Sequence, residues 1–559
     1  MAVRALVILH PIFQCSNPSN KKRPFQQTPS LSSFRTNLIS FGFRLRSKLF
    51  LSSPSSQQTP SSPKDNPAEA YRAEPHTDKP IGYLLIRSIS GLLGRIRVDN
   101  VGFEILSIAL PAALALGADP IASLVDTAFV GHIGSVELAA VGVSVSIFNL
   151  VSKLFNVPLL NVTTSFVAEQ QALDSNEGSN IQKPEMLMSG KKLLPAVSTS
   201  LALAAGIGIL EALALSLGSG LLMNIMGIPV DSPMRAPAEQ FLTFRAYGAP
   251  PIVIALAAQG TFRGFMDTKT PLYAIAIGNL LNAALDLVLL FYLGLGVGGA
   301  AIATVVSEYV IAFILLWKLN EKVILLLPNM GVGVVRYLTS GGLLIARTIA
   351  VLLTMTLATS MAAKEGPIPM AAHQICLQVW LAVSLLNDAL ALAGQALLAS
   401  EYTKGNYKQA RTVIYRALQI GVISGIMLAL VLYLSFEAFS SVFTNDQAVL
   451  NIIRSGVWFV TLSQPINALA FVFDGLYYGV SDYAYAAYSM VLVGLLSSVF
   501  LLVASPISGL PGVWTGLFLF MFLRTAAGFL RLGSKAGPWK MVWSDDNRKL
   551  NQATEEWHP

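Results

Sequence analysis

The sequence predicts an all-α integral membrane protein with about twelve transmembrane helices, arranged as two pseudo-symmetric six-helix bundles. Of the 559 residues, 53% are hydrophobic and only 12% are charged, whereas a soluble domain carries about 25% charged residues. Apolar runs of about 20 residues, each long enough to cross a bilayer as a helix, recur along the chain. This pattern excludes a large soluble enzyme. The net charge of +7 requires no nucleic acid, because membrane proteins concentrate Lys and Arg in loops on one side.

The first element, residues 1–76, has the composition of a transit peptide followed by a disordered leader. Residues 1–64 contain nine Lys or Arg and no acid, and serine is abundant, as in organellar targeting segments. The serine content favours a plastid over a mitochondrion; the alternative is a disordered cytosolic tail. Residues 77–100 form a linker. Within residues 81–98, apolar residues recur at helical spacing and form a stripe between arginines. That stripe suits either an interfacial helix or a solvated lead-in.

Twelve apolar cores follow, six in a first bundle (101–330) and six in a second (331–535), with a polar tail at 536–559. The predicted cores are 103–130, 139–168, 193–226, 238–262, 271–294 and 299–318, then 337–362, 370–399, 412–443, 452–478, 484–506 and 511–533. Loops after even-numbered cores carry twelve Lys or Arg, Arg263 among them, and loops after odd-numbered cores carry three. By the positive-inside rule, both termini face the basic side, which is the stroma for a protein of the chloroplast inner envelope.

The two bundles repeat one another in sequence. Residues 139–169 match 371–401 at a constant offset of 232, and residues 259–264 echo 474–479. Gly299 and Gly512 open the last core of each half. Parallel repeats of this kind are a known transporter design with the binding site between the halves; a duplication without transport is the alternative.

Carboxylates within apolar cores are the candidate coupling groups. Asp126 lies in the first core, where a charged side chain costs ~2.5–3.5 kcal/mol on insertion scales; the alternative is a helix-end residue that reaches water. Asn279, Asn282 and Asp286 share one face of the fifth core. Two carboxylates brought close in a low dielectric cannot both be ionised cheaply, so the pair predicts a proton acceptor. The alternative is an Asn/Asp ladder that only joins helices.

The repeat confines this chemistry to the first bundle. At the repeat offset Asp126 corresponds to Ala358, and Asp286 corresponds to the apolar stretch around Leu501. The second bundle therefore has the scaffold without these carboxylates.

Two cations and a histidine are candidate substrate ligands. Lys153 lies midway along the second core and Arg347 lies in the seventh. Because a guanidinium binds carboxylates in a bidentate manner, we expect an anionic substrate; the alternative is pairing with an internal acid such as Glu211. His373 and Gln374, on the eighth core, are expected to line the cavity, unless His373 is a packing residue. The five histidines have no metal-ligand spacing, so no metal or cofactor is expected.

Three segments resemble the signature of the multidrug and toxic compound extrusion (MATE) family. They are the run from Asp126 to Gly134 (DTAFVGHIG), residues 262–271 (FRGFMDTKTP) and residues 282–304. Residues 346–351 (ARTIAV) and 378–382 (QVWLA) are similar to its DinF-like branch, which includes plant DETOXIFICATION proteins and citrate exporters. The resemblance covers about 101–535. It implies exchange of H⁺ or Na⁺ for an organic solute by alternating access, with a cation site at Asp126, Asn282, Asp286 and Thr304. The loop at 170–192 is shorter than that of dedicated citrate exporters, so citrate is one candidate among organic acids.

The sequence therefore predicts a secondary active antiporter that exports an organic anion, citrate-like in chemistry. The alternatives are a broad-specificity exporter of cationic drugs with the same fold and a flippase for lipid-linked substrates. An enzyme would need a nucleophile–base or metal constellation, and none is found in the sequence. The expected partners are a small organic solute and the lipid bilayer, with the chain as a monomer.

Overall fold

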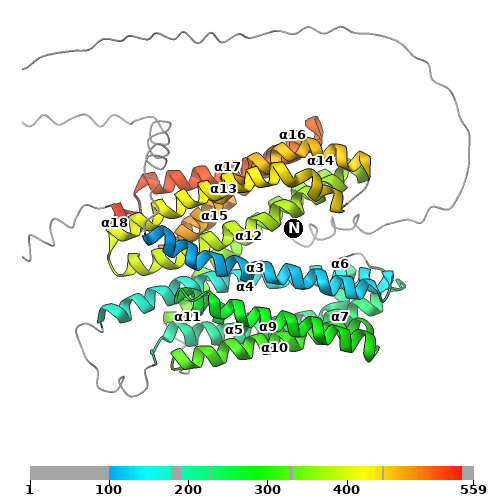
Figure 1. Cartoon of the computed structure of the whole chain (residues 1–559), viewed down its shortest axis with the longest axis horizontal. Coiled ribbons are helices and arrows are strands. Elements are labelled where there is room, and N and C mark those ends of the chain that lie inside the picture. The colour runs from blue at the N-terminus through cyan, green and yellow to red at the C-terminus, as the bar shows by residue number, and fades with distance from the viewer. Residues whose placement is uncertain (1–99, 178–190, 227, 326–331, 444–445, 544–559) are drawn as a thin grey trace, which may run out of the picture. The chain divides into compact units, whose positions relative to one another are not determined.

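The computed structural model describes residues 100–177, 191–226, 228–325, 332–443 and 446–543 (Figure 1). The predicted transit peptide and leader, the linker up to residue 99 and the tail beyond residue 543 lie outside the described residues. The described part is helical, apart from one isolated bridge between Lys192 and Val323. The all-α prediction is confirmed.

The helices of the two halves follow the predicted cores. The first half contains α3 (Asn100–Gly131), α4 (Ser135–Glu177), α5 (Pro195–Leu217), α6 (Ser219–Ile225), α7 (Arg235–Ala246), α8 (Ala249–Gly264), α9 (Lys269–Asp286), the π-helix η3 (Leu287–Tyr292) and α10 (Gly296–Lys322). The second half contains α11 (Val332–Lys364), α12 (Pro367–Thr403), α13 (Tyr407–Phe443), α14 (Gln447–Leu462), α15 (Gln464–Gly479), α16 (Tyr483–Ser508), α17 (Leu510–Ser534) and α18 (Trp539–Trp543).

These helices provide up to twelve membrane crossings. Within the described residues, ten helices are long and apolar enough to cross a membrane, and two further pairs qualify when each is taken as one bent span. The pairs are α7 with α8 and α14 with α15, and each bends by 46°. Pro250 and Pro251 begin α8 and Pro465 begins α15; proline has no N–H to continue the preceding helix. The bends therefore have the same cause in both halves.

The internal repeat is visible in two close helix contacts, one in each half. A Cβ atom on Gly208 of α5 would lie 2.6 Å from the Cα of Pro250, and a Cβ on Gly425 of α13 would lie 2.6 Å from the Cα of Pro465. Only glycine allows backbones to approach this closely. The third and fourth crossings of each half therefore meet in the same way.

The loops after the bent spans repeat as well. Met266 and Ser481 adopt positive φ angles of 60° and 56°, and each is followed by an aspartate that forms an ion pair with the last crossing of its own half. These pairs are Asp267 with Lys322, at 2.7 Å, and Asp482 with Arg531, at 2.8 Å. The sequence echo of 259–264 and 474–479 thus extends to a shared loop geometry.

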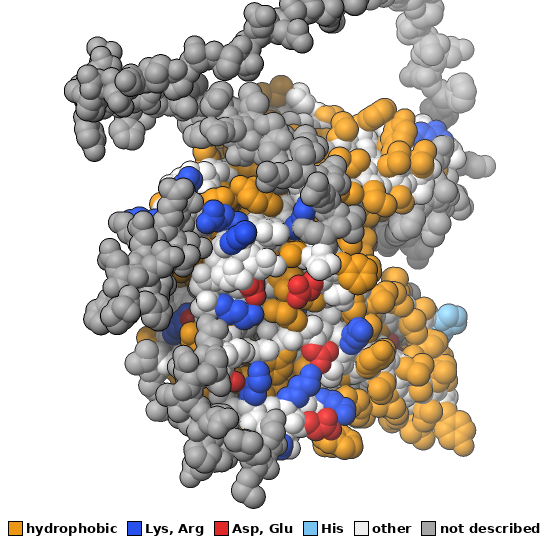
Figure 2. Space-filling view, turned by 60° about the vertical axis from the view of Figure 1, so that its left-hand side comes forward, with side chains coloured by type: hydrophobic (Ala, Val, Ile, Leu, Met, Phe, Trp, Pro, Cys, Tyr) orange, Lys and Arg blue, Asp and Glu red, His pale blue; other side chains and the backbone are white. Residues whose placement is uncertain are grey.

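The basic end of the molecule is the end at which α4, α10 and α12 finish and α5, α11 and α13 begin. Lys192, Lys318, Lys322, Lys404 and Lys408 are exposed there. Figure 2, in which the left-hand side of Figure 1 comes forward, shows Lys and Arg side chains gathered with acids on this face and hydrophobic side chains along its flank. Large apolar side chains such as Leu434 and Ile507 are exposed along the helices, as expected of a surface that faces lipid.

The hydrogen bonds that join the two bundles lie toward the basic end. The Gln395 amide nitrogen of α12 donates to the Asn161 carbonyl and to Ser165 Oγ of α4, both at 2.8 Å. Ser165 Oγ in turn donates to the Tyr478 carbonyl of α15 at 2.8 Å. We call these four residues the seam. Nearby, Arg336 of α11 pairs with Glu169 of α4 at 2.7 Å, and the Tyr337 hydroxyl donates to the Ala196 carbonyl at 3.1 Å.

The start of the predicted polar tail packs against the second bundle. Trp539, in α18, is 1% exposed, and its indole nitrogen donates to Asp482 at 3.0 Å. The aromatic residues of the segment WKMVW allow this short helix to bury one face, so the polar part of the tail begins later than residue 536.

Candidate functional site

The structure brings three of the predicted coupling residues together between α3 and α9. The Asn282 amide nitrogen donates to Asp126 Oδ1 at 2.7 Å, and the Asp126 and Asp286 carboxyl groups lie close enough to act on each other. Asp286 and Asn282 are only 1% and 3% exposed. One turn away, Asn279 donates to Asp119 at 3.4 Å, a longer contact in the same helix pair. We call Asp126, Asn282 and Asp286 the acid site.

The acid site has unsatisfied oxygen atoms. Among the described residues, neither carboxylate oxygen of Asp286 nor the Asn282 side-chain oxygen has a hydrogen-bond donor. Two ionised carboxylates offer only acceptors, so Asp126 and Asp286 can share a hydrogen bond only when one of them carries a proton. The arrangement is therefore short of one cation or one proton.

The helix geometry changes at this point in the chain. The α-helix α9 ends at Asp286 and continues directly as the π-helix η3, over residues 287–292. Short π-helical segments are frequent at functional sites because they change the direction in which side chains point. The periodicity of the apolar residues gave no sign of this change.

The equivalent position in the second bundle is apolar, as the repeat predicted. Ala358 on α11 and Leu501 on α16 are 1% and 0% exposed and belong to one hydrophobic cluster. The helices α11 and α16 pack against each other, as α3 and α9 do in the first bundle. The scaffold is thus shared, and the paired carboxylates belong to the first bundle.

Thr304 lies on α10, which packs against α9. Its hydroxyl donates to the Ala300 carbonyl of its own helix at 2.9 Å. The proton of this hydroxyl is therefore engaged within α10, although its lone pairs remain available to a cation.

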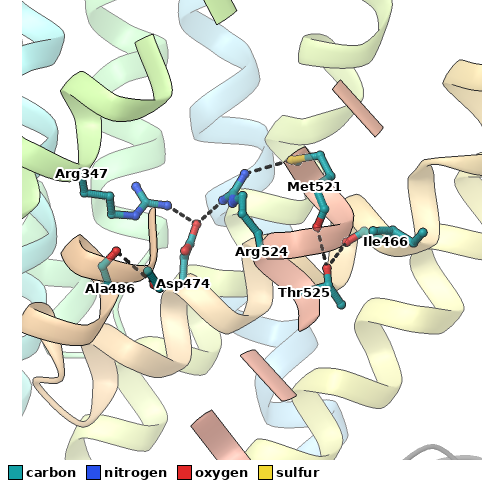
Figure 3. Close-up of polar contacts among 8 residues, drawn as sticks. Arg347, Ile466, Asp474, Ala486, Met521, Arg524 and Thr525 are labelled. Atoms are coloured by element: carbon teal, nitrogen blue, oxygen red, sulfur yellow. Dashed lines mark hydrogen bonds and ion pairs between the residues drawn. The ribbon is translucent and has the colours of Figure 1, made fainter. Parts of the chain in front are cut away.

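Arg347 is ion-paired within the second bundle. Its guanidinium contacts Asp474 of α15, and the same carboxylate oxygen contacts Arg524 of α17 (Figure 3). Arg524 also donates to Met521 Sδ at 3.1 Å. We call Arg347, Asp474 and Arg524 the arginine cluster. The alternative that Arg347 pairs with an internal acid is the observed one, but the suggested acid, Glu211, is wrong. Glu211 lies on α5 of the first bundle, where Ser152 donates to it.

The other three candidate substrate residues differ in environment. Lys153 is exposed on α4 and forms no ion pair with an acid in the part of the chain that the structure describes. Gln374 is half-buried. His373 is 1% exposed, and neither ring nitrogen has a partner among the described residues. Lys153 and Arg347 therefore do not form a matched pair of free cations.

His373 lies at a small hollow in the second bundle, with a cavity volume of about 30 Å³. Four aromatic side chains, those of Trp380, Phe459, Trp514 and Phe518, form much of its wall, and Ser463 and Asn467 contribute polar groups. A cavity of this volume has room for about one or two water molecules and is much smaller than a typical small-molecule pocket, although its aromatic walls and few polar groups are of the kind that line such pockets.

Arg263 is a cation whose position the sequence analysis misjudged. It was expected in a basic loop, but it lies in the last turn of α8 and is 6% exposed. No described acid lies within ion-pair distance of it, and the charges that act on it are those of Asp388 in the second bundle and Asp119 in the first. The residue that follows it, Gly264, could have indicated this burial. Gly264 packs against Val167 of α4, and this close contact buries the last turn of α8.

Comparisons with known proteins agree with this architecture. The sequence matches the family described as MatE over residues 190–288 and 344–503. It is 67% identical over 448 residues to Protein DETOXIFICATION 44, chloroplastic, of Arabidopsis thaliana, a match that covers 80% of this chain and 85% of the relative. It is 25% identical over 449 residues to the DNA damage-inducible protein F of Escherichia coli K12, covering 78% of this chain and 91% of that protein.

Solved structures show the same fold. The outward-facing conformation of a multidrug resistance MATE family transporter of the MOP superfamily superposes with a TM-score of 0.70 at 19% identity, covering 80% of this chain and 97% of that chain. A MATE protein in its bent conformation gives a TM-score of 0.70 at 18% identity, covering 79% and 96%. The twelve crossings, the repeated halves and the identity to the DETOXIFICATION protein lead to one conclusion: the chain belongs to the multidrug and toxic compound extrusion (MATE) family of transporters.

Proposed function

We propose that this MATE transporter is a secondary antiporter that exports an organic anion in exchange for protons by alternating access. The observation that carries the proposal is the acid site. Asp126 and Asp286 are neighbours inside membrane-crossing helices, and no donor reaches either oxygen of Asp286 within the described residues. A site that is complete only with an added positive charge is suited to couple ion binding to a conformational change.

A proton accounts for the acid site better than Na⁺ does. One proton between Asp126 and Asp286 supplies the missing donor and removes one of the two buried negative charges. A sodium ion would need several oxygen ligands at once. Thr304 would have to be one of them, and among the described residues its hydroxyl makes no hydrogen bond to the acid site but donates to Ala300 within α10. Sodium coupling remains the outcome that would replace this part of the proposal.

The preference for an anion rests on cations near the interface of the bundles. Arg263 is buried without an ion pair to a described acid, and such a guanidinium is costly unless a ligand or water satisfies it. The arginine cluster holds two guanidinium groups against one carboxylate. Asp388, exposed on α12, acts on Arg263, Arg347 and Arg524. A carboxylate of a bound organic acid could supply, next to Arg263, the negative charge that Asp388 now supplies from a distance. Lys153 is a further exposed cation.

The seam supports alternating access. Because the polar contacts between the bundles lie toward the basic end, the transporter is held closed on that side. The opposite end has to close, and the seam has to open, for a solute to cross. The plastid relatives and the transit-like leader favour the chloroplast inner envelope, with the basic end and both termini in the stroma.

A second candidate function follows from the aromatic hollow at His373. The hollow is too small to hold a solute in the conformation described, so it would have to widen during alternating access. When widened, its aromatic walls would suit a planar, apolar solute better than citrate, and this favours the alternative of a broad-specificity exporter of xenobiotics, including cationic drugs. The two candidates differ in what Arg263 does. Only an anion gains from the guanidinium.

The test is solute uptake into proteoliposomes driven by a pH gradient, with radiolabelled citrate and a cationic dye assayed in parallel. We expect citrate to move and Arg263→Gln to raise its KM at least tenfold. Lys318→Gln, which removes an exposed cation at the basic end, is the matched control and should leave uptake unchanged. If only the dye moves, or if Arg263→Gln behaves as Lys318→Gln does, the organic-anion proposal is wrong.

A further inference from the structure

The geometry points to a second proton-binding site in the first bundle, formed by Glu211 of α5 with Ser152 and Asn156 of α4. It shares no residue with the acid site. Its role in transport rests on the proposed proton coupling, but its occupancy by a proton can be measured without any solute.

Glu211 is buried with incomplete hydrogen bonding. It is 3% exposed, and Ser152 Oγ donates to its Oε2 at a long 3.5 Å. Asn156, one turn further along α4 and 2% exposed, lies beside the carboxyl group. Within the described residues, neither amide atom of Asn156 nor Glu211 Oε1 makes a hydrogen bond of good geometry. Buried polar atoms are normally satisfied, so this cluster lacks something.

No cation compensates a negative charge on Glu211. The helices α4, α6, α7, α8 and α11 pack against α5, and among the described residues the side chains that act on Glu211 are Asn156 and Ser152. The cations on those helices are engaged elsewhere or exposed. Arg235 pairs with Glu239, Arg245 with Glu308, Arg336 with Glu169 and Arg347 with Asp474. Arg263 lies near Asp388 and Asp119, and Lys153 of α4 and Lys364 of α11 are exposed. An ionised carboxylate in a membrane-crossing helix with no partner is strongly disfavoured.

One proton resolves the uncompensated charge and two of the three unpartnered atoms. Protonated Glu211 has an O–H group at Oε1 that can donate to Asn156 Oδ1, so a single hydrogen satisfies two unpartnered acceptors. Ser152 continues to donate to Oε2, which becomes the carbonyl oxygen of the neutral acid. The neutral form therefore leaves only Asn156 Nδ2 without a partner, whereas the ionised form leaves a buried charge that no cation compensates.

The depth of Glu211 in the bundle relates it to the acid site. Glu211 lies six residues before the end of α5, Asp126 five residues before the end of α3, and Asp286 six residues before the end of η3. These are the first, third and fifth crossings, so they run in the same direction. At ~1.5 Å per residue, the three carboxyl groups lie at similar depths, in the half of the bundle away from the basic end. Both sites are thus placed to exchange protons from the same side.

The test is infrared spectroscopy of the carboxylic C=O stretching band, on the full chain in lipid nanodiscs at neutral pH. The background variant Asp126→Asn/Asp286→Asn removes the acid site. In this background we expect Glu211→Gln to abolish one protonated-carboxyl band. Ser152→Ala should shift that band to higher frequency, because the carbonyl oxygen loses its donor. Ser146→Ala, on the exposed face of the same helix, is the matched control and should leave it unmoved.

The result that overturns the inference is a protonated-carboxyl spectrum that Glu211→Gln leaves unchanged, since Glu211 would then be ionised. A thermal unfolding scan of each variant establishes that it is folded. The failure of the proposed function is a separate result: if Asp126→Asn/Asp286→Asn still couples uptake to the pH gradient, the acid site fails, while the Glu211 band still reports on this second site.

Discussion

The Asp474 carboxylate is predicted to be the most sensitive single side chain for the stability of the second bundle. It is the shared partner of Arg347 and Arg524 (Figure 3), and these side chains are only 14% and 7% exposed. Asp474→Asn keeps the shape of the side chain and removes the charge. Two buried guanidinium groups then face each other with only the more distant Asp388 to oppose them.

The magnitude follows from the burial of the cluster. Removing one partner of a buried ion pair costs about 3–5 kcal/mol, because a charge is left without compensation. Here two pairs share one carboxylate, so we expect the loss to lie at the upper end, about 5 kcal/mol. A shift of ~2 °C in Tm per kcal/mol, the low end for domains of about 200 residues, converts this to roughly 10 °C.

The chain contains its own reporter for the measurement. Cys376 is 3% exposed in α12, so a thiol-reactive fluorophore labels it only as the second bundle unfolds. The midpoint of labelling on heating gives the apparent Tm in detergent or nanodiscs. Because Cys15 lies outside the described residues, the assay uses a Cys15→Ser background for every variant.

The matched control is Glu321→Gln, which breaks the Lys318–Glu321 pair. Those side chains are 51–52% exposed, and an exposed pair contributes only ~0–1 kcal/mol. Asp474→Asn should therefore lower the Tm several times more than Glu321→Gln does. Equal shifts in the two variants would refute the reasoning that the arginine cluster is held by Asp474.

Three further predictions test other parts of the structure. Gly425→Ala should lower the free energy of unfolding by about 1–3 kcal/mol, since its Cβ would lie 2.6 Å from a backbone atom of Pro465. Gly341→Ala, which has open space around the new Cβ, should leave the stability unchanged. Equal thermal midpoints for the two variants would contradict this prediction. Burial opposes ionisation of Asp267, but hydrogen bonds from Lys322 and Thr270 lower its pKa below the ordinary value. Asp267→Asn should therefore cost about 0.5–1 kcal/mol at neutral pH, a difference that disappears as the pH falls below ~4; a difference that grows on acidification would contradict it. Gln395→Ala removes two hydrogen bonds of the seam, worth about 1–3 kcal/mol together, and should lengthen spin-label distances between the bundles at the basic end; unchanged distances would show that the seam does not hold that end closed.

Much of the fold could be predicted because each bilayer-crossing helix corresponds to a long apolar run in the sequence. Each of the twelve predicted cores corresponds to one crossing, and even the two bent crossings were found as single spans. The repeat at offset 232 predicted that Ala358 and Leu501 would replace the acids of the first bundle, and the structure packs both into one apolar cluster. Helical periodicity placed Asn282 and Asp286 on one face, and the resemblance to the MATE family implied that this face would meet Asp126.

What the sequence could not provide is the choice of partner between helices. Arg347 and Arg524 lie 177 residues apart in the chain and come together because both bind Asp474, which lies between their helices. No local sequence pattern predicts that these three side chains are in contact. The burial of Arg263 depends on the close packing of α8 against α4. The lack of a described cation beside Glu211 likewise depends on which charged groups the neighbouring helices place there. Hydrophobic periodicity does not predict which helices are neighbours.

The central claim is that Asp126 and Asp286 carry the proton that drives transport. The measurement is uptake into proteoliposomes after a pH jump, compared with solute–solute exchange in the same vesicles, for wild type and Asp126→Asn. Each pH unit supplies ~1.4 kcal/mol per proton, so wild-type accumulation should rise with the gradient. We predict that Asp126→Asn abolishes this dependence while solute exchange and Glu321→Gln controls remain active. If Asp126→Asn still accumulates solute in proportion to the pH gradient, the acid site is structural and the proton couples elsewhere.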